Sequence, residues 1–287
     1  MTMTLESLDH LSARDFQRLS EFIHSYSGIK MPVSKQSMVE GRLRRRVRAL
    51  GVATLGDYCR YLFDQDGLES EAVGLIDAVS TNKTDFFREP DHFEFLAEQA
   101  VPALLAAQQV SRRAPLKIWS AACSIGAEPY TLAMVAAEIA RANPDVRTSI
   151  LATDICTEVI ETATLGIYPE SMIMPVPVDL RHRYVMRAKS GARDRVRIVP
   201  ELRAMVGFGR LNLMDRTYPV DHDMHVIFCR NILIYFDKKT QQQVLSQLCD
   251  HLRPGGYLFL GHSETLAGFG LPLRAVATTV FQRLGDT

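Results

Sequence analysis

One short stretch of the sequence combines small residues with a carboxylate where a predicted strand passes into a predicted helix. The stretch reads SAACSIGAEPYT, and Gly126 with its small neighbours would let a ligand approach the backbone at the start of the helix. It lacks the G-x-G-x-x-G pattern of a dinucleotide cradle. Glu128 would repel a pyrophosphate and attract a positively charged ligand, such as a sulfonium amino acid. Alternatively, Glu128 only stabilises its own helix, by interacting with the positive end of the helix dipole. The motif alone leaves both interpretations open.

A second carboxylate ends the next predicted strand. Asp154 closes the segment LATDIC, about 28 residues after Gly126, and an acidic residue in this place commonly accepts hydrogen bonds from ribose hydroxyls. The plainer alternative is a solvated aspartate at a strand end. Because no partner for a 2′-phosphate lies nearby in the sequence, the pattern favours a nucleoside over NADP.

Two later segments add side chains at predicted strand ends. In GRLNLMD, Asn212 and Leu213 can bond and cover an adenine ring, although Asn is common in loops. In FCRNILIYF, Arg230 and Asn231 are expected at the carboxyl edge of the sheet, and Tyr235 follows four residues later. A tyrosine inside an apolar run is usually a core residue, so a role for Tyr235 depends on the neighbouring motifs.

The segment STNKTDFFREPDHF lies between two regions of different pattern. Asn82, Thr84 and Arg88 interleave there with Phe86 and Phe87. The adjacent phenylalanines are expected to anchor the segment on both regions. Arg88 beside that apolar anchor would be desolvated, and a desolvated guanidinium is well placed to grip a carboxylate.

Five arginines crowd the predicted helix over residues 37–50, where they fill the faces left by the apolar residues. Such a run is usually a solvated face. It can also dock an acidic helix or a phosphate backbone. The arginines are Arg42, Arg44, Arg45, Arg46 and Arg48.

The spacing of metal-ligating residue types predicts no metal site. Asp221, His222, Asp223 and His225 resemble ligands, but their spacing fits no zinc pattern and they lead into a predicted strand. The five cysteines are scattered and form no C-x-x-C pair, which favours free thiols in a reducing cytoplasm.

These segments lie in a region where predicted strands alternate with predicted helices. Such alternation indicates an α/β fold with a parallel sheet covered on both faces, in which ligands bind at the carboxyl ends of the strands. A basic and apolar alternation around residues 180–208 predicts a small antiparallel β insertion. The predicted strands of the main sheet cover 116–123, 148–155, 225–236 and 257–264.

The first eighty residues differ, because apolar residues recur there at helical spacing after three sequences of the capping-box type. We therefore expect an all-α domain over 1–80, a linker over 81–92 and the α/β domain over 93–287. The capping sequences begin at Ser12, Ser37 and Thr54.

Length and composition agree with a globular chain of about two domains. The 287 residues carry 33 basic and 33 acidic side chains, and 47% are hydrophobic. A zero net charge argues against a general nucleic-acid binder. The sequence has no apolar run of membrane-spanning length and no secretory signal pattern, so we expect a cytoplasmic protein without membrane insertion.

Taken together, the motifs resemble those of the CheR family of chemotaxis receptor methyltransferases, and the resemblance extends over nearly the whole chain. It implies a class I methyltransferase sheet with S-adenosylmethionine as cofactor and S-adenosylhomocysteine as product. It further implies a monomer that methylates glutamates on the cytoplasmic helices of chemoreceptors, in some members with help from a receptor tail peptide. The motifs are TNKTDFFRE, WSAACSIGAEPY, ATDI, LNL, FCRNILIYFD and LRPGGYLFLGHSE.

The resemblance also implies roles for single residues. The cofactor would be held by one set of side chains, and Arg88 and Tyr235 would face the reacting carboxylate. Ala127 departs from the family, which often has a second glutamate there. The cofactor set is Asn82, Thr84, Arg88, Glu128 (methionine amino group), Asp154 (ribose), Asn212 and Leu213 (adenine), Arg230 and Asn231.

Three alternatives stay open at this point. A methyltransferase acting on nucleic acid would usually carry a proline-rich [DNS]-P-P-[YF] motif after the fourth strand, where this chain reads CRNILIY. A methyltransferase acting on another protein or a small molecule, and an adaptor that has lost catalysis, are the remaining alternatives. Binding of S-adenosylhomocysteine would distinguish the enzyme from the adaptor.

Overall fold

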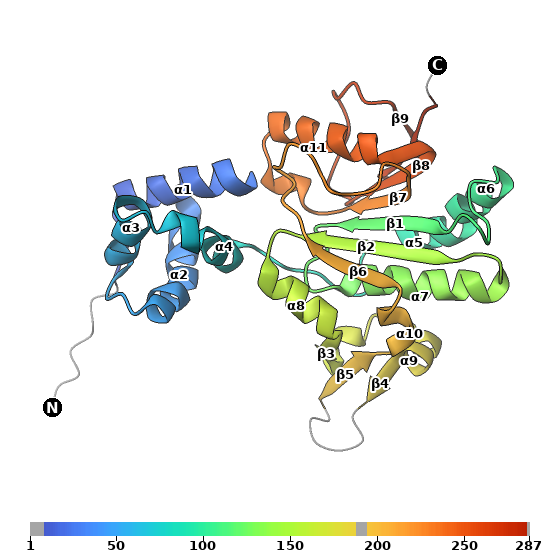
Figure 1. The fold of residues 1–287 in the computed structure, drawn as a ribbon, viewed down its shortest axis with the longest axis horizontal. Helices are drawn as coiled ribbons and strands as arrows, with labels where there is room; N and C mark the ends of the chain where they lie inside the picture. The colour runs from blue at the N-terminus through green and yellow to red at the C-terminus, as the bar shows by residue number, and fades with distance from the viewer. Residues whose placement is uncertain (1–8, 188–193, 286–287) are drawn as a thin grey trace. The chain divides into compact units, whose positions relative to one another are not determined.

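The helical spacing of the N-terminal region produces α-helices (Figure 1). The apolar residues that recur along them are mostly buried. The computed structural model describes residues 9–187 and 194–285. The chain divides between Thr81 and Asn82 into two units. The first unit contains α1 (Ala13–Ser27), a 3₁₀ turn (Val33–Lys35), α2 (Gln36–Leu50), α3 (Leu55–Asp64) and α4 (Leu68–Val79).

Two of the three expected helix caps are confirmed. The Ser12 hydroxyl accepts the backbone N–H of Asp15 at 3.0 Å, before the first turn of α1. The Thr54 hydroxyl accepts the N–H of Asp57 at 3.0 Å, before α3. Each cap satisfies one of the backbone donors that the start of a helix leaves without a partner.

The third expected cap, at Ser37, is wrong. Helix α2 begins one residue earlier, at Gln36, without a side-chain cap. Glu40 is instead buried, and its carboxylate accepts the backbone N–H of Leu11 and the side-chain amide of Gln36, each at 3.0 Å. A buried carboxylate needs such donors, so tertiary contacts rather than local capping determine the role of Glu40.

The second unit is built on a sheet of seven strands in the order β6-β2-β1-β7-β8-β10-β9. The five strands from β6 to β8 are parallel, and β10 runs antiparallel to β8 and β9. Because the chain moves outward from β1 in one direction and returns to β7 on the other side, the switch point lies between β1 and β7. The strands are β1 (Leu116–Ala121), β2 (Thr148–Asp154), β6 (Val206–Arg210), β7 (Met224–Cys229), β8 (Leu252–Leu260), β9 (Leu273–Ala277) and β10 (Val280–Arg283).

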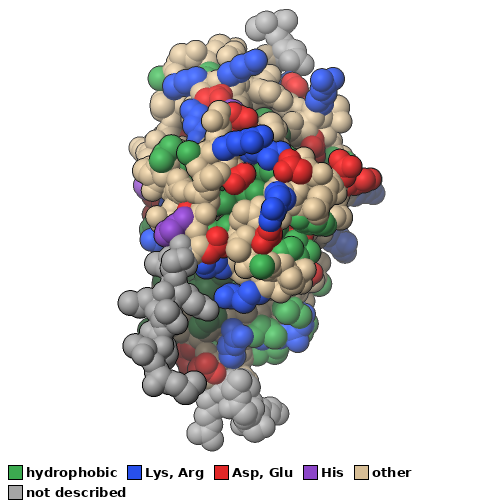
Figure 2. Space-filling model, turned by 90° about the vertical axis from the view of Figure 1, so that its left-hand side faces the viewer, with side chains coloured by type: hydrophobic (Ala, Val, Ile, Leu, Met, Phe, Trp, Pro, Cys, Tyr) green, Lys and Arg blue, Asp and Glu red, His purple; other side chains and the backbone are tan. Residues whose placement is uncertain are grey.

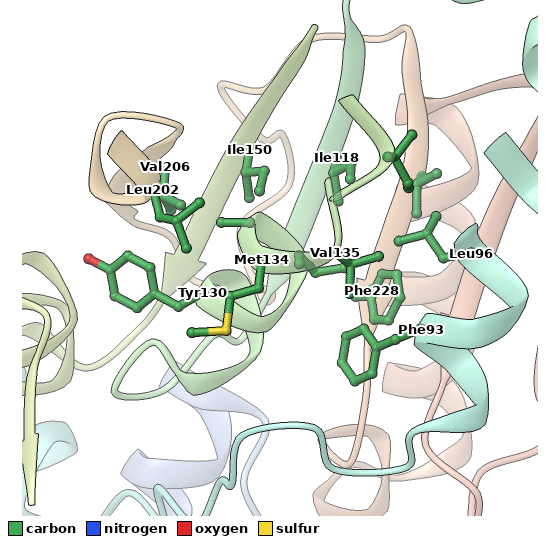
Figure 3. Packing of buried hydrophobic residues seen from close by; sticks show 14 of the residues in the cluster. Phe93, Leu96, Ile118, Tyr130, Met134, Val135, Ile150, Leu202, Val206 and Phe228 are labelled. Carbon is green, nitrogen blue, oxygen red and sulfur yellow. The ribbon is translucent and has the colours of Figure 1, made fainter. Parts of the chain in front are cut away.

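Helices cover this sheet and close its core. In Figure 3, Val135 from α7 lies near Ile118 of the central strands, and Phe93 lies beside Phe228. Met134 and Ile150 belong to the same buried hydrophobic cluster. Burial of these apolar side chains is the main favourable term in the stability of this layer. The helices are α5 (Asp91–Phe95), a π-helical turn (Leu96–Ala100), α6 (Val101–Ala106), α7 (Ala127–Ala142), α8 (Thr157–Leu165) and α11 (Lys238–His251).

A small antiparallel sheet interrupts the chain between α8 and β6. Its strand order is β3-β5-β4, and it differs in extent from the stretch 180–208 expected for the insertion. It begins earlier, because β3 follows α8 directly, and the end of that stretch belongs to the main sheet as the start of β6. The elements are β3 (Ile167–Pro169), a 3₁₀ turn (Glu170–Ile173), α9 (Val178–Tyr184), β4 (Val185–Arg187), β5 (Arg195–Ile198) and α10 (Pro200–Arg203).

No helix among the described residues is long and apolar enough to span a membrane.

Candidate active site

The loop after β1 holds its backbone in a conformation that few residues adopt. Ala122, Ser124 and Gly126 have positive φ angles of 63°, 52° and 91°. At Gly126 a Cβ would lie 2.8 Å from the Ala163 Cβ and 2.9 Å from the Tyr168 hydroxyl oxygen, so only glycine fits. Left-handed conformations at non-glycine residues carry strain and are concentrated at functional sites.

Asp154 joins this loop to the carboxyl end of β2. One oxygen of its carboxylate accepts the N–H of Ser124 at 2.8 Å, and the other accepts the N–H of Cys156 at 3.0 Å. The side chain is buried. A carboxylate oxygen can accept more than one hydrogen bond.

Glu128, in the first turn of α7, does more than favour the helix dipole. It is buried, its Oε1 accepts the hydroxyl of Ser120 at 2.7 Å, and its Oε2 pairs with Nε of Arg230 at 2.7 Å. Ser120 belongs to β1 and Arg230 follows β7. Glu128 therefore links the two strands that flank the switch point.

Arg230 is buried over two aromatic rings, with its guanidinium carbon 5.2 Å from the centre of the Phe93 ring and 5.5 Å from that of Phe228. Its Nη1 donates to the backbone carbonyl of Arg88 at 2.8 Å and to Nδ1 of His92 at 3.1 Å. Arg230 thus attaches the segment before α5 to the carboxyl edge of the sheet.

The loop after Arg230 differs from the long strand expected over 225–236. Strand β7 ends at Cys229, Asn231 has a positive φ of 59°, and a 3₁₀ turn spans Leu233–Tyr235. The buried carboxylate of Glu264 accepts the N–H groups of Asn231 at 2.9 Å and Leu233 at 2.7 Å. Because these N–H groups bind a side chain, they cannot form hydrogen bonds with a neighbouring strand, and β7 ends before them.

Glycine 261 allows the two loops to approach. A Cβ at Gly261 would collide with the side-chain nitrogen of Asn231. The N–H of Gly261 donates to Glu264 at 2.7 Å. Tyr235, at the end of the 3₁₀ turn, is half-buried rather than part of the core expected for an apolar run.

The segment that begins the second unit packs on the loop after β1. The carbonyl of Asn82 accepts the Ser124 hydroxyl at 3.0 Å, and the Asn82 amide lies 3.7 Å from Sγ of Cys156. Arg88 is half-buried, and its Nη1 is 3.4 Å from the carbonyl of Lys83. Thr84 lies between them on the same segment, also half-buried.

Asn212 and Leu213 come next to Asp154 at the end of β6. The N–H of Leu211 donates to the carbonyl of Asp154 at 2.9 Å, which fixes the start of this turn. Both side chains are buried, and the Asn212 amide oxygen accepts the N–H of Met214 at 3.0 Å. The sequence-predicted cofactor residues of the second unit therefore come from adjoining loops at one edge of the sheet.

Three acidic or basic groups near this edge were missed by the sequence analysis: Glu89, His92 and Glu264. Each is at least partly buried and binds Arg230 or the loop that follows it. Glu89 and Glu264 lie within the quoted motifs TNKTDFFRE and LRPGGYLFLGHSE. A carboxylate inside such a motif was the available signal, but no spacing rule indicated what it binds.

The aspartates and histidines around residue 221 have other partners. Lys117 Nζ lies 2.9 Å from Asp221 and 2.8 Å from Asp223, and His225 accepts the backbone N–H of Lys117 at 3.1 Å. Glu89, His92 and His262 have ligand-type atoms within 4.8 Å of one another. The guanidinium of Arg230 already contacts two of these three groups, and its positive charge would oppose a cation there.

A large cavity adjoins this region, because Phe87, Pro90 and Phe93 contribute to its lining. It measures about 1010 Å³ and is lined mainly by apolar side chains of α5, α6 and α7, including Phe93, Val101 and Val135. No residue of the predicted catalytic or cofactor set lines it. The candidate site therefore rests on the side-chain geometry at the sheet edge rather than on cavity size.

The arginine-rich helix α2 contains a partly buried ion pair. Nε and Nη2 of Arg46 bind the two carboxylate oxygens of Glu71 at 2.6 and 2.7 Å, and the Tyr58 hydroxyl donates to Glu71 at 3.0 Å. Gly74 leaves room for this guanidinium, because a Cβ there would lie 2.8 Å from it. Arg46 thus serves the packing of the first unit.

The other arginines of α2 divide into two kinds. Arg42 and Arg44 are half-buried, and each donates to a backbone carbonyl of the same unit, at 2.5 and 2.6 Å. Arg45 and Arg48 are exposed. Figure 2 shows basic side chains interspersed with acidic ones on the face that it draws. Arg45 and Arg48 are therefore the arginines of this helix best exposed to a macromolecular partner.

Comparison with known families identifies the class of this protein. The model described as "CheR methyltransferase, SAM binding domain" matches residues 82–281. The model described as "CheR methyltransferase, all-alpha domain" matches residues 14–80. With the strand order of the sheet, these matches define a class I methyltransferase that depends on S-adenosylmethionine.

Named relatives cover nearly the whole chain. "Chemotaxis protein methyltransferase 2" of Pseudomonas aeruginosa is 37% identical over 272 residues, covering 95% of this chain and 94% of the relative. "Chemotaxis protein methyltransferase" of Escherichia coli K12 is 37% identical over 268 residues, covering 93% and 90%. The protein of the same name from Salmonella typhimurium is 39% identical over 258 residues, covering 90% and 85%. The chain belongs to the CheR methyltransferase family.

Proposed function

We propose that this enzyme transfers the methyl group of S-adenosylmethionine to glutamate side chains of chemotaxis receptors in the cytoplasm, forming glutamate methyl esters. One observation carries the proposal. Two buried carboxylates lie at the carboxyl edge of a methyltransferase sheet: Glu128 in the first turn of the helix after β1, and Asp154 at the end of β2. Buried negative charge there fits a cofactor that is a nucleoside with cationic groups.

The residues present fit the cofactor in chemical type. We assign the ribose hydroxyls to Asp154, the methionine amino group to Glu128, and the adenine to Asn212 and Leu213. The other residues of the predicted cofactor set would make polar contacts with the methionine part of the cofactor or lie around it. They are Asn82, Thr84, Arg88, Arg230 and Asn231. When bound, the cofactor supplies an electrophilic methyl group on a positively charged sulfur.

The protein's own contribution to the reaction would be positioning and exclusion of water. A glutamate with its ordinary pKa of about 4.3 is ionised at pH 7, so no general base is needed. Arg88 and the Tyr235 hydroxyl would orient that carboxylate about 3 Å from the carbon it attacks. Their grip must stay moderate, because strong binding of the free carboxylate would stabilise the ground state and slow the reaction.

Recognition of the receptor would involve the first unit. Chemoreceptor methylation helices are acidic in the proteins that this family modifies, and the exposed Arg45 and Arg48 of α2 have the complementary charge. The family's tail-peptide contact would fall around residues 188–195, most of which lie outside the described residues. We expect the enzyme to act as a monomer.

Incubation with radiolabelled S-adenosylmethionine and receptor-containing membranes tests the proposal. Label that enters the receptor and is released by mild base indicates glutamate methyl esters. Label on another protein, on a small molecule or in base-stable form would favour a different methyltransferase. Failure to bind S-adenosylhomocysteine would favour the non-catalytic adaptor.

A further inference from the structure

Glu89 binds three separate backbone and side-chain groups at the carboxyl edge of the sheet. Its Oε1 accepts the side-chain amide of Asn231 at 3.1 Å and the backbone N–H of His262 at 3.3 Å. Its Oε2 pairs with Nη1 of Arg230 at 3.3 Å. The side chain is 12% exposed. Glu89 is therefore a largely buried carboxylate held by the segments that follow β7 and β8.

Arg230 is shared between Glu89 and Glu128. Its side chain is 3% exposed, and its Nε binds Glu128 at 2.7 Å. One guanidinium thus neutralises only one of the two carboxylates that contact it, and the three side chains together carry one net negative charge. Because water screens buried charges weakly, this net charge acts on a ligand bound beside Glu128.

The neighbouring titratable groups leave that charge in place. Burial would raise the pKa of Glu89, but the Asn231 amide and the Arg230 charge hold it below its usual value, so Glu89 is ionised at neutral pH. Burial and Arg230 lower the pKa of His92 to about 4, which keeps this ring neutral. His262 lies 3.1 Å from the Asp91 carboxylate, which offsets any charge on the more exposed ring.

We propose that Glu89 is a positioning residue that gives the cofactor pocket its net negative charge through Arg230 and Glu128, and thereby makes the pocket favour a sulfonium ligand over a thioether. The inference rests on the proposed function, because it takes Glu128 to lie beside the cofactor. S-adenosylmethionine carries one more positive charge than S-adenosylhomocysteine and differs from it otherwise by a methyl group. A net negative pocket would thus discriminate substrate from product by charge.

The substitution Glu89→Gln removes the charge and keeps the shape of the side chain. We expect it to weaken binding of S-adenosylmethionine about tenfold and binding of S-adenosylhomocysteine by less than about twofold. Calorimetric titration of both ligands, without receptor, measures the ratio of the two dissociation constants. A loss of fold or of local order would weaken both ligands alike, so the ratio reports on charge.

Two further variants make the test specific. Glu89→Asp keeps the charge on a shorter side chain and should preserve the wild-type ratio even if both affinities fall. Glu94→Gln removes an exposed charge from the neighbouring α5 and should leave the ratio unchanged.

The possible results separate the inference from the proposed function. An unchanged ratio in Glu89→Gln, or an equal change in Glu94→Gln, would overturn the inference. If the wild-type protein bound neither ligand, the proposed function would fail instead.

Discussion

At the scale of single residues, Arg230 joins parts of the chain that are far apart in sequence. Its partners Glu128 and His92 are 102 and 138 positions away. Replacing Arg230 would leave buried carboxylates without their counter-charge, a change that typically costs about 3–5 kcal/mol of stability. A half-buried side chain of the predicted catalytic set is therefore a cleaner probe of catalysis than Arg230 itself.

Tyr235 is such a probe. We expect Tyr235→Phe to lower kcat about tenfold, because the loss of one orienting hydrogen bond to the charged reacting carboxylate removes about 1.4 kcal/mol of stabilisation. The affinity for S-adenosylhomocysteine should stay the same. Methyl transfer to receptor membranes and calorimetry measure the two quantities. An unchanged kcat at equal affinity would contradict this role for the hydroxyl.

His92 gives the fold a defined dependence on pH. Because Arg230 can only donate, Nδ1 of His92 accepts from it, and Nε2–H donates to the Thr279 hydroxyl at 2.9 Å. Burial, and then the nearby Arg230 charge, lower the pKa of His92 from 6.5 to about 4. The unfolded chain therefore takes up this proton first as the pH falls, and stability is lost between about pH 6.5 and pH 4.

The contribution of His92 to that loss is about 3 kcal/mol when its full pKa shift is counted. His92→Gln keeps a polar side chain that does not titrate. Urea unfolding at a series of pH values measures the free energy of unfolding of both proteins. We expect the wild type to lose about 3 kcal/mol relative to the variant between pH 7 and a pH below 4. Parallel pH profiles of the two proteins would refute the assignment.

The same residues show what the sequence can and cannot indicate. The types and positions of Glu128 and Asp154 indicate a carboxylate beside each of two strand ends, because a strand, a turn and a helix can be recognised locally. The pairing of Glu128 with Arg230 depends on how β1 and β7 adjoin, which no local pattern contains. Glu89 and Glu264 were missed for the same reason, since only the folded chain buries them.

At the scale of elements, the end of β7 shows how a buried side chain can override a local pattern. The apolar run from residue 225 to 236 predicts one long strand, but Glu264 captures the backbone N–H groups of Asn231 and Leu233. The strand ends at Cys229 as a result. Caps at Ser12 and Thr54 could be predicted because the donor and acceptor lie three residues apart.

Helix α2 offers a prediction of the same scale. Arg46→Ala would leave the buried Glu71 carboxylate without its guanidinium, so we expect a loss of about 3 kcal/mol in the stability of the first unit. Arg48→Ala removes an exposed arginine from the same helix and should change stability by less than about 0.5 kcal/mol. Chemical unfolding followed by circular dichroism measures both. Equal effects would mean that the ion pair is not important for the packing of α2.

At the scale of the whole molecule, the two units would divide the work between chemistry and recognition. The predicted cofactor residues all belong to the unit after Thr81, and the arginine-rich helix belongs to the unit before it. The overall charge is zero, so a basic surface for an acidic receptor has to be local. Charge reversal on one unit should thus affect receptor binding and leave cofactor binding intact.

The double variant Arg45→Glu/Arg48→Glu tests this division. Since surface charge chiefly guides association, we expect the apparent KM for receptor to rise about tenfold at low salt, and the effect to shrink as salt increases. The affinity for S-adenosylhomocysteine should not change. The matched control is Arg112→Glu/Arg113→Glu, which makes the same change in net charge at two exposed positions before β1. If the control raised KM as much, or if neither variant changed it, α2 would not be the docking surface.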